Sequence, residues 1–286
     1  MNKRIPVVLA LGAALLLASL QPITAQAATT KKLVWRQEFN GKALVKPDQS
    51  IWGYDLGSLN ANSEEQYYTN SKYNASMDGK GNLLITAKRI VEGSDLWMKC
   101  ISCKFSSARL KTQGKLGFKY GRMEARIKMP AGVGTWPAFW MLGANLENLG
   151  WPDAGELDIV EARGADPTVV FGTAHGPGYN GSNGTQYGST AYANAPLSDG
   201  YHIYAIEWGK NYVNWYFDDQ IYLRMTPASV APDEYVFNKE MFLILNLAMG
   251  GSFTGDIDPN LQRSRMYVDY IRYYKINGVG TVIKRK

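Results

Sequence analysis

The sequence predicts an all-β protein made of two packed antiparallel sheets. In residues 122–129 apolar side chains occupy every second position until Pro130 ends the run, as expected for a strand with one face in a core. Similar runs cover residues 81–87, 201–208, 212–217, 242–247 and 267–274. Asp218-Asp219 predicts a hairpin turn between two of them. Many strands joined by glycine-rich turns indicate a sandwich of two sheets.

The first residues predict a secretory signal peptide. Lys3 and Arg4 precede an apolar run from Ile5 to about Leu20, and the small-residue sequence Ala25-Gln26-Ala27 follows. The run could instead be a membrane anchor, but the Ala-x-Ala site and the polar stretch before it favour removal. Residues 1–27 are therefore the expected signal peptide and 28–286 the mature, secreted chain. Nothing later approaches the about 20 apolar residues that a membrane span needs.

The mature chain is expected to form one catalytic domain, because no repeat, low-complexity linker or Pro/Ser-rich hinge divides it, and this length suits an all-β domain. Loss of Lys3 and Arg4 lowers the formal net charge from +6 to +4. Such a mild charge does not indicate a nucleic-acid partner. Residues 284–286 form a short basic tail, and we expect a monomer.

The two cysteines, Cys100 and Cys103, are close in sequence. A disulfide is the default in an exported protein, although so short a loop strains its geometry and two free thiols stay an alternative. A zinc site is not indicated, because two cysteines and two separated histidines do not resemble a zinc ligand cluster.

The chemistry is predicted by three carboxylates in an apolar, strand-like run, Glu156-Leu157-Asp158-Ile159-Val160-Glu161. An unpaired carboxylate in a buried strand costs several kcal/mol, which calls for a compensating role. Glu156 and Asp158 share one face of the strand, but Glu161 should face the other way. We therefore predict a β-bulge around Ile159-Val160, which returns Glu161 to the face of Glu156.

With such a bulge the two glutamate Cα atoms lie roughly 13 Å apart, which leaves roughly 5 Å between their carboxylates. That separation is typical of retaining glycosidases, in which one carboxyl is the nucleophile and the other the acid and then the base. Asp158 can hold the rotamer of Glu156, and the pair is expected to titrate as a unit. The alternative is a solvated edge strand with three surface acids; the apolar residues between them weaken it.

The segments around these acids resemble glycoside hydrolase family 16, and most closely its laminarinase-like endo-1,3-β-glucanases. The resemblance rests on Trp136-Pro137-Ala138-Phe139-Trp140-Met141-Leu142-Gly143, Gly155–Glu161 and Gly172–Pro177, and it continues through 64–69, 107–110, 120–126, 202–208, 245–251 and 268–271. It covers nearly the whole mature chain. It implies a β-jelly-roll of two antiparallel sheets, in which the concave sheet forms the substrate cleft.

Position by position, the resemblance implies Glu156 as the nucleophile, Asp158 as its assisting carboxylate and Glu161 as the general acid/base. It further implies sugar-binding side chains on the donor side and near the acid/base: Asn62, Arg109, Trp136, Trp140 and His175. Trp136 and Trp140 are an even number of residues apart, so both can face one side of a strand; the alternative for either is a place in the core. A tryptophan offers a flat apolar face to a sugar ring.

The chain departs from the resemblance at two places. Ser63 stands where many relatives carry a second Asn, and Ala162-Arg163 follows the last acid where an aromatic or amide residue is common. Both leave the subsite preference open without touching the three acids.

The resemblance also implies a structural calcium ion held by Glu38, the carbonyl of Gly81 and Asp269, since calcium prefers oxygen ligands. A plain pair of strand-edge carboxylates is the alternative for Glu38 and Asp269. No cofactor is expected for the chemistry.

We therefore expect a secreted retaining endo-hydrolase of 1,3-β-glucan, acting on a polysaccharide partner. One alternative keeps the mechanism but moves it to mixed-linkage β-glucan or another polysaccharide, or transfers the sugar to another sugar. A second alternative, from another class, is a non-catalytic glucan-binding protein. The intact acids argue against that reading.

Overall fold

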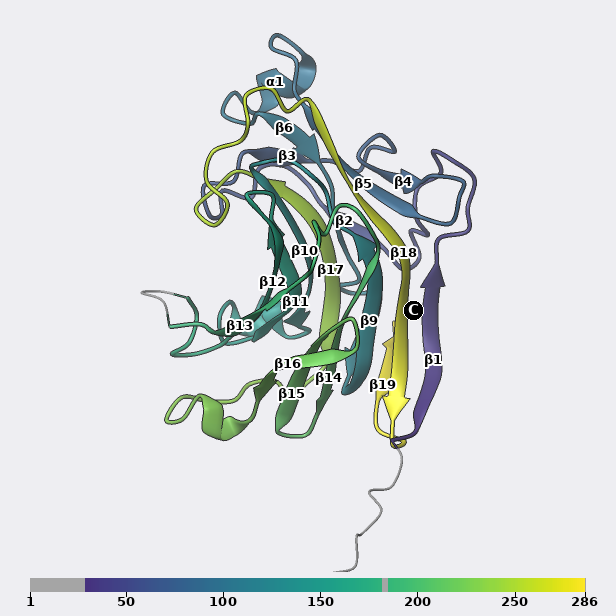
Figure 1. The fold of residues 1–286 in the computed structure, drawn as a ribbon, viewed down its shortest axis with the longest axis vertical. Coiled ribbons are helices and arrows are strands. Elements are labelled where there is room, and N and C mark those ends of the chain that lie inside the picture. Colours follow the sequence, from purple (N-terminus) through teal and green to yellow (C-terminus); the bar gives the residue numbers. More distant parts are fainter. Residues whose placement is uncertain (1–28, 182–184, 286) are drawn as a thin grey trace, which may run out of the picture.

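The computed structural model describes residues 29–181 and 185–285, so the predicted signal peptide lies outside the described residues. Two curved sheets lie face to face (Figure 1). We call them the back sheet and, because it carries the three acids, the carboxylate sheet. None of the helices in the described ranges is long and apolar enough to span a membrane.

In residues 29–181 and 185–285 the back sheet has ten strands. In spatial order they are β16 (Gln220–Met225), β15 (Tyr212–Phe217), β14 (His202–Gly209), β9 (Gly121–Lys128), β18 (Arg263–Ile276), β5 (Leu83–Arg89), β6 (Phe105–Ser107) and β3 (Gln66–Tyr68), with β1 (Lys31–Glu38) on β18 and β4 (Ala75–Met77) on β5.

The carboxylate sheet has nine strands in the described part of the chain. In spatial order they are β13 (Tyr187–Tyr192), β12 (Asp166–His175), β11 (Glu156–Arg163), β10 (Thr135–Gly143), β17 (Met241–Met249), β7 (Arg109–Lys111) and β2 (Gly53–Asp55), with β8 (Leu116–Lys119) on β17 and β19 (Thr281–Lys284) on β8. Within the described residues, short helical segments join strands at α1 (Asp95–Lys99), α2 (Leu146–Leu149) and the 3-10 turn η2 (Pro227–Ser229).

The strand predictions are confirmed. Each expected run lies within a strand apart from at most two residues at an end, and in β9 the apolar side chains are fully buried: Met123, Ala125 and Ile127. Arg122 and Glu124 on the other face of β9 are also buried, and they pair with each other. Asp218 and Asp219 form the two-residue turn between β15 and β16, both with positive φ (46° and 63°), the conformation that matches the twist of a tight hairpin. The pairing is antiparallel as expected except between β3 and β6, which run parallel.

The core lies between the sheets. Alternate residues of β10 and β17, including Phe139, Met141, Leu243 and Leu245, point into it and are fully buried. Because side chains alternate along a strand, the other residues of the same strands lie on the opposite, open face of the carboxylate sheet. The acids lie on that face.

The cysteine question is settled by the structure. Cys100 and Cys103 are joined by a disulfide that closes the end of α1.

Candidate active site

A β-bulge in β11 brings the acids to one face, as predicted. Asp158 lies opposite Trp140 and Glu161 opposite Ala138, so three steps along β11 match two along β10. The same offset appears against β12. The extra residue turns Glu161 to the open side, while the apolar residues between the two acids are fully buried in the core.

Burial raises the pKa of all three carboxyls. The pKa of Glu156 is raised well above its ordinary value by burial and then by the charge of Asp158. The pKa of Asp158 is raised by burial and by Glu161. Burial also raises the pKa of Glu161, although a hydrogen bond from Trp136 opposes the shift. Buried like charges cannot all ionise easily, so this cluster retains a proton at pH values where isolated carboxyls are ionised.

His175 ends β12 directly opposite Glu156. Its Nε2 lies 3.2 Å from Oδ2 of Asp158 and 3.8 Å from Oε1 of Glu156. The prediction placed this histidine near the acid/base Glu161, and the interaction with His175 does lower the pKa of Glu161, against the rise that burial causes. The direct contacts of its Nε2, however, are with Asp158 and Glu156.

The two predicted tryptophans both lie on the open face, with different partners. The indole Nε1–H of Trp136 donates to Oε1 of Glu161 at 2.8 Å. The Nε1–H of Trp140 donates to Oδ1 of Asn246 at 2.7 Å, and the Asn246 amide donates to the hydroxyl of Tyr68. Of these two tryptophans, Trp136 therefore contacts one of the catalytic carboxyls directly, whereas Trp140 belongs to a neighbouring row of polar side chains. Asn246 was not predicted, although its place in an apolar strand was a signal.

Trp151 is a contact that the sequence reasoning missed. It lies in the turn between α2 and β11, its side chain is about half exposed, and its Nε1–H donates to Oε2 of Glu156 at 3.0 Å. Its ring centroid lies 6.1 Å from that of His175. The available signal was its position five residues before Glu156, but a turn residue gives no periodicity from which its direction can be read.

Arg109 lies in the same part of the face and is held in place. Its Nε lies 2.9 Å from Oδ2 of Asp55, which also pairs with Lys111 at 2.6 Å. Its guanidinium carbon lies 4.6 Å above the ring of Trp140. Arg109 and Trp140 are therefore neighbours on this face, and Asp55 is the carboxylate that orients the arginine.

Asn62 lies in an exposed loop, where its amide donates to Oε1 of Glu64 at 3.2 Å. Glu64 is close enough to Glu161 to contribute to the raised pKa of that carboxyl. Gln66 also donates to Glu64, and its own carbonyl oxygen accepts from the backbone N–H of Met249 in β17. The structure therefore connects Asn62 to the acid/base end of the row through Glu64.

The departure at Arg163 has a structural explanation. Its guanidinium lies 4.8 Å from the ring centroid of Phe171 and 5.0 Å from that of Phe253, and it pairs with Asp166. Phe253 in turn packs against Trp136, with ring centroids 4.9 Å apart. Arg163 therefore supports the loop that covers one side of Trp136.

Among the described residues, the side chains grouped closely enough to share a metal ion are Glu156, Asp158 and His175, whose ligand atoms lie within 4.8 Å of one another. Two of them are the carboxyls with the strongest acidity shifts, so an ion held there would occupy the reacting groups.

The predicted calcium ligands lie on neighbouring strands, but both carboxylates face an arginine. Glu38 accepts two hydrogen bonds from Arg272 (2.8 and 3.2 Å), and Asp269 accepts one from Arg126 (2.6 Å). Gly81 precedes β5 and adopts φ +96°. A calcium ion would have to replace these ion pairs, so the donor set does not fit calcium in the arrangement seen here.

Comparisons with known proteins agree with this geometry. The sequence model of "Glycosyl hydrolases family 16" matches residues 62–272. The chain is 38% identical to a "Beta-glucanase" of Rhodothermus marinus, covering 85% of each chain. It is 36% identical to "Glucan endo-1,3-beta-glucosidase A1" of Niallia circulans, over 85% of this chain but only 38% of that longer protein.

The structure also resembles a solved one. It aligns with the laminarinase catalytic domain of Thermotoga maritima MSB8 with a TM-score of 0.77 and 39% identity, covering 86% of this chain and 98% of that domain. The similarity therefore extends over the whole sandwich.

Proposed function

The chain belongs to glycosyl hydrolase family 16, and from this we propose that it hydrolyses internal bonds of 1,3-β-glucan with retention of configuration at the anomeric carbon. The family match and the relatives described above support a glycosidase. The relatives named as laminarinase and endo-1,3-β-glucosidase support the 1,3-β linkage. The observation that carries the proposal is the bulge in β11, because it places Glu156 and Glu161 on one face of one strand.

In the first step, we assign attack on the anomeric carbon to the carboxylate of Glu156. Glu161, as the acid, gives its proton to the glycosidic oxygen, so the bond to the leaving sugar breaks as the ester to Glu156 forms. The raised pKa of Glu161 favours the protonated form that this step needs. The N–H of Trp151 stabilises the charge on Glu156 before attack.

In the second step, Glu161 takes a proton from water, and the resulting hydroxide attacks the anomeric carbon of the glycosyl-enzyme. The ester bond breaks, Glu156 leaves as a carboxylate, and two inversions give net retention. Asp158 and His175 touch the nucleophile end and hold its geometry and charge. No metal is needed for either step.

Asn62, Arg109, Trp136 and Trp140 are proposed to bind the sugar units beside the acids. The ring of Trp136 offers an apolar face, and the guanidinium of Arg109, oriented by Asp55, offers hydrogen-bond donors to hydroxyls. Mixed-linkage glucan remains the alternative substrate, because linkage choice depends on loops around these residues.

The direct test is reducing-sugar release, with product chromatography, from laminarin, lichenan and agarose. We expect short oligosaccharides from laminarin at the highest rate, and proton NMR of the first products should show the β-anomer. Faster release of reducing sugar from lichenan or agarose would show that 1,3-β-glucan is not the preferred substrate. The α-anomer as first product would overturn the retaining mechanism. No hydrolysis of any of the three polysaccharides would favour a non-catalytic glucan-binding protein.

Glu156→Gln tests the nucleophile. Turnover should fall by more than about 1,000-fold because the amide cannot form the ester, while laminarin binding persists. Glu147→Gln, an exposed glutamate in α2, is the control and should keep full activity. Wild-type turnover in the Glu156 variant would sink the assignment.

Export of the mature chain and a monomeric state belong to the same proposal. The sequence of residues 1–27 supports export. Mass spectrometry of protein secreted by an expressing cell should give a chain that begins at Ala28, and light scattering should give the mass of a single chain.

A further inference from the structure

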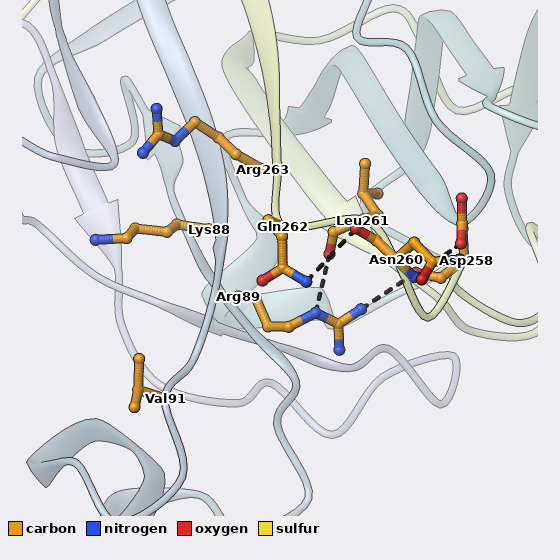
Figure 2. Close-up of a pocket in the computed structure, with 8 residues that line it drawn as sticks. All are labelled: Lys88, Arg89, Val91, Asp258, Asn260, Leu261, Gln262 and Arg263. Atoms are coloured by element: carbon orange, nitrogen blue, oxygen red, sulfur yellow. Dashed lines mark hydrogen bonds between the residues drawn. The ribbon is translucent and has the colours of Figure 1, made fainter.

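A recess with basic residues in its walls lies away from Glu156, Asp158 and Glu161, where β5 and β18 meet at one end of the back sheet. It measures about 570 Å³, and its walls include Lys88, Arg89, Leu261, Gln262 and Arg263 (Figure 2). Neither the catalytic carboxyls Glu156, Asp158 and Glu161 nor the proposed sugar-binding residues line it. We call it the basic recess.

Two like charges face each other across the strands of this recess. Lys88 of β5 and Arg263 of β18 are direct partners in the antiparallel register, and both side chains are exposed. Figure 2 shows them extending to the same side. Among the described residues neither has an ion pair, and Arg265, two residues further on the same face, has none either. Like charges directly opposite each other destabilise a sheet, so stability does not account for the pair.

The third cation, Arg89, is used inside the protein. Its Nε donates to the carbonyl oxygen of Leu261 at 2.9 Å and its Nη2 to that of Asp258 at 3.1 Å, while the guanidinium lies 4.8 Å from the ring centroid of Phe105. These contacts fix the loop that forms one wall of the recess. This wall of the recess is therefore ordered before a ligand arrives, which lowers part of the ordering cost of binding.

The acidic residue that lines the recess, Asp258, does not neutralise the pair. The carboxylate of Asp258 accepts the backbone N–H of Asn260 at 2.8 Å, and it lies at the opposite end of the recess from Lys88 and Arg263 (Figure 2). The side-chain amide of Gln262 lies between the two ends and can bind a hydroxyl group.

We propose that the basic recess binds a carboxylate-bearing polysaccharide, with one carboxylate held between Lys88 and Arg263. The charge is complementary, and an amide beside two cations suits an acidic sugar, which carries hydroxyls next to its carboxylate. The basic recess is separate from the acids and does not depend on which of them is the nucleophile.

Affinity electrophoresis in gels containing polygalacturonate tests the proposal, with dextran gels as the neutral reference. We expect polygalacturonate to retard the wild-type protein, and Lys88→Gln/Arg263→Gln to weaken the apparent affinity by about tenfold or more. The matched control is Lys42→Gln/Lys80→Gln, which removes the same charge from two exposed lysines elsewhere and should be retarded like wild type. An equal loss of affinity for polygalacturonate in both double variants would show that only net charge matters, and it would overturn the proposed binding site.

Two further measurements separate binding from folding and from other anions. Lys88→Gln alone should melt at the same or a higher temperature than wild type, because a like-charge contact is removed, and laminarin hydrolysis should be unchanged in every variant. Vesicles containing anionic phospholipid are the second probe. Recess-dependent vesicle binding without retardation by polygalacturonate would overturn the polysaccharide assignment.

Discussion

The indole Nε1–H of Trp151 donates a hydrogen bond to Oε2 of Glu156 at 3.0 Å, although the two residues belong to different elements. The donor comes from a half-exposed turn and the acceptor from a buried strand. A donor to a carboxylate favours its charged form. In a carboxyl whose pKa burial has raised, this contact restores part of the ionisation that a nucleophile needs.

Replacing Trp151 should therefore change the acidic side of the pH profile. In Trp151→Phe the charged form of Glu156 loses a donor, its pKa rises further, and the acidic limb of kcat/KM should move to higher pH by about one unit or less. Trp97→Phe, in α1, is the control and should leave the profile unchanged. An unshifted acidic limb in Trp151→Phe would show that the contact does not tune the nucleophile.

Replacing Trp136 and replacing Trp140 should have different effects on the pH profile of kcat/KM. Trp136→Phe removes the hydrogen bond that lowers the pKa of Glu161, so this pKa rises. Because Glu161 must be protonated for the first step, the alkaline limb of kcat/KM should move to higher pH. Trp140→Phe, whose indole donates to Asn246, should keep the wild-type limb and raise KM only. The same alkaline shift in both variants would contradict a specific contact with Glu161.

Asp158 should limit stability at neutral pH. Burial and the charge of Glu161 raise its pKa, so the folded chain binds more protons than the unfolded chain above the unfolded pKa of about 4. The free energy of unfolding then falls as pH rises from that value through the folded pKa. Asp158→Asn avoids this loss, so its melting temperature should exceed that of wild type at pH 7 and match it at pH 3. The difference at pH 7 should be about 2–4 °C for each 1 kcal/mol of unfolding free energy that the wild type loses.

Thermal unfolding at pH 3, 5 and 7 checks this expectation. Asp199→Asn, an exposed carboxylate, is the control and should follow the wild-type curve at each pH. Laminarin hydrolysis by Asp158→Asn should fall, because stability and activity place opposite demands on this carboxyl. A lower melting temperature at pH 7 would mean that the charge of Asp158 is compensated in the folded protein.

Calcium removal discriminates between the two readings of Glu38 and Asp269. The ion pairs with Arg272 and Arg126 predict that chelation with EDTA leaves the melting temperature unchanged. Differential scanning calorimetry with and without added CaCl₂ measures it. A melting temperature that falls with EDTA and recovers with calcium would show that the ion replaces the arginines, and Glu38→Gln should then abolish the response.

The sequence by itself determined the architecture and the reacting groups. Alternation in runs such as β9 needs only the period of a strand, and Asp218-Asp219 needs only local turn geometry. The bulge in β11 could be predicted because apolar residues facing the core and acids sharing the opposite face had to be reconciled within six positions. Local periodicity and the cost of buried charge were sufficient for these features.

Only the tertiary structure decided which side chains meet across strands and loops. The pairing of His175 with Glu156 depends on strand register, the support of Arg109 by Asp55 on β2 lying beside β7, and the contact of Trp151 on the path of a turn. A one-residue change of register would move every such partner to the other face. These contacts join residues whose relative position no local pattern encodes, so the partners of the acids had to come from the fold.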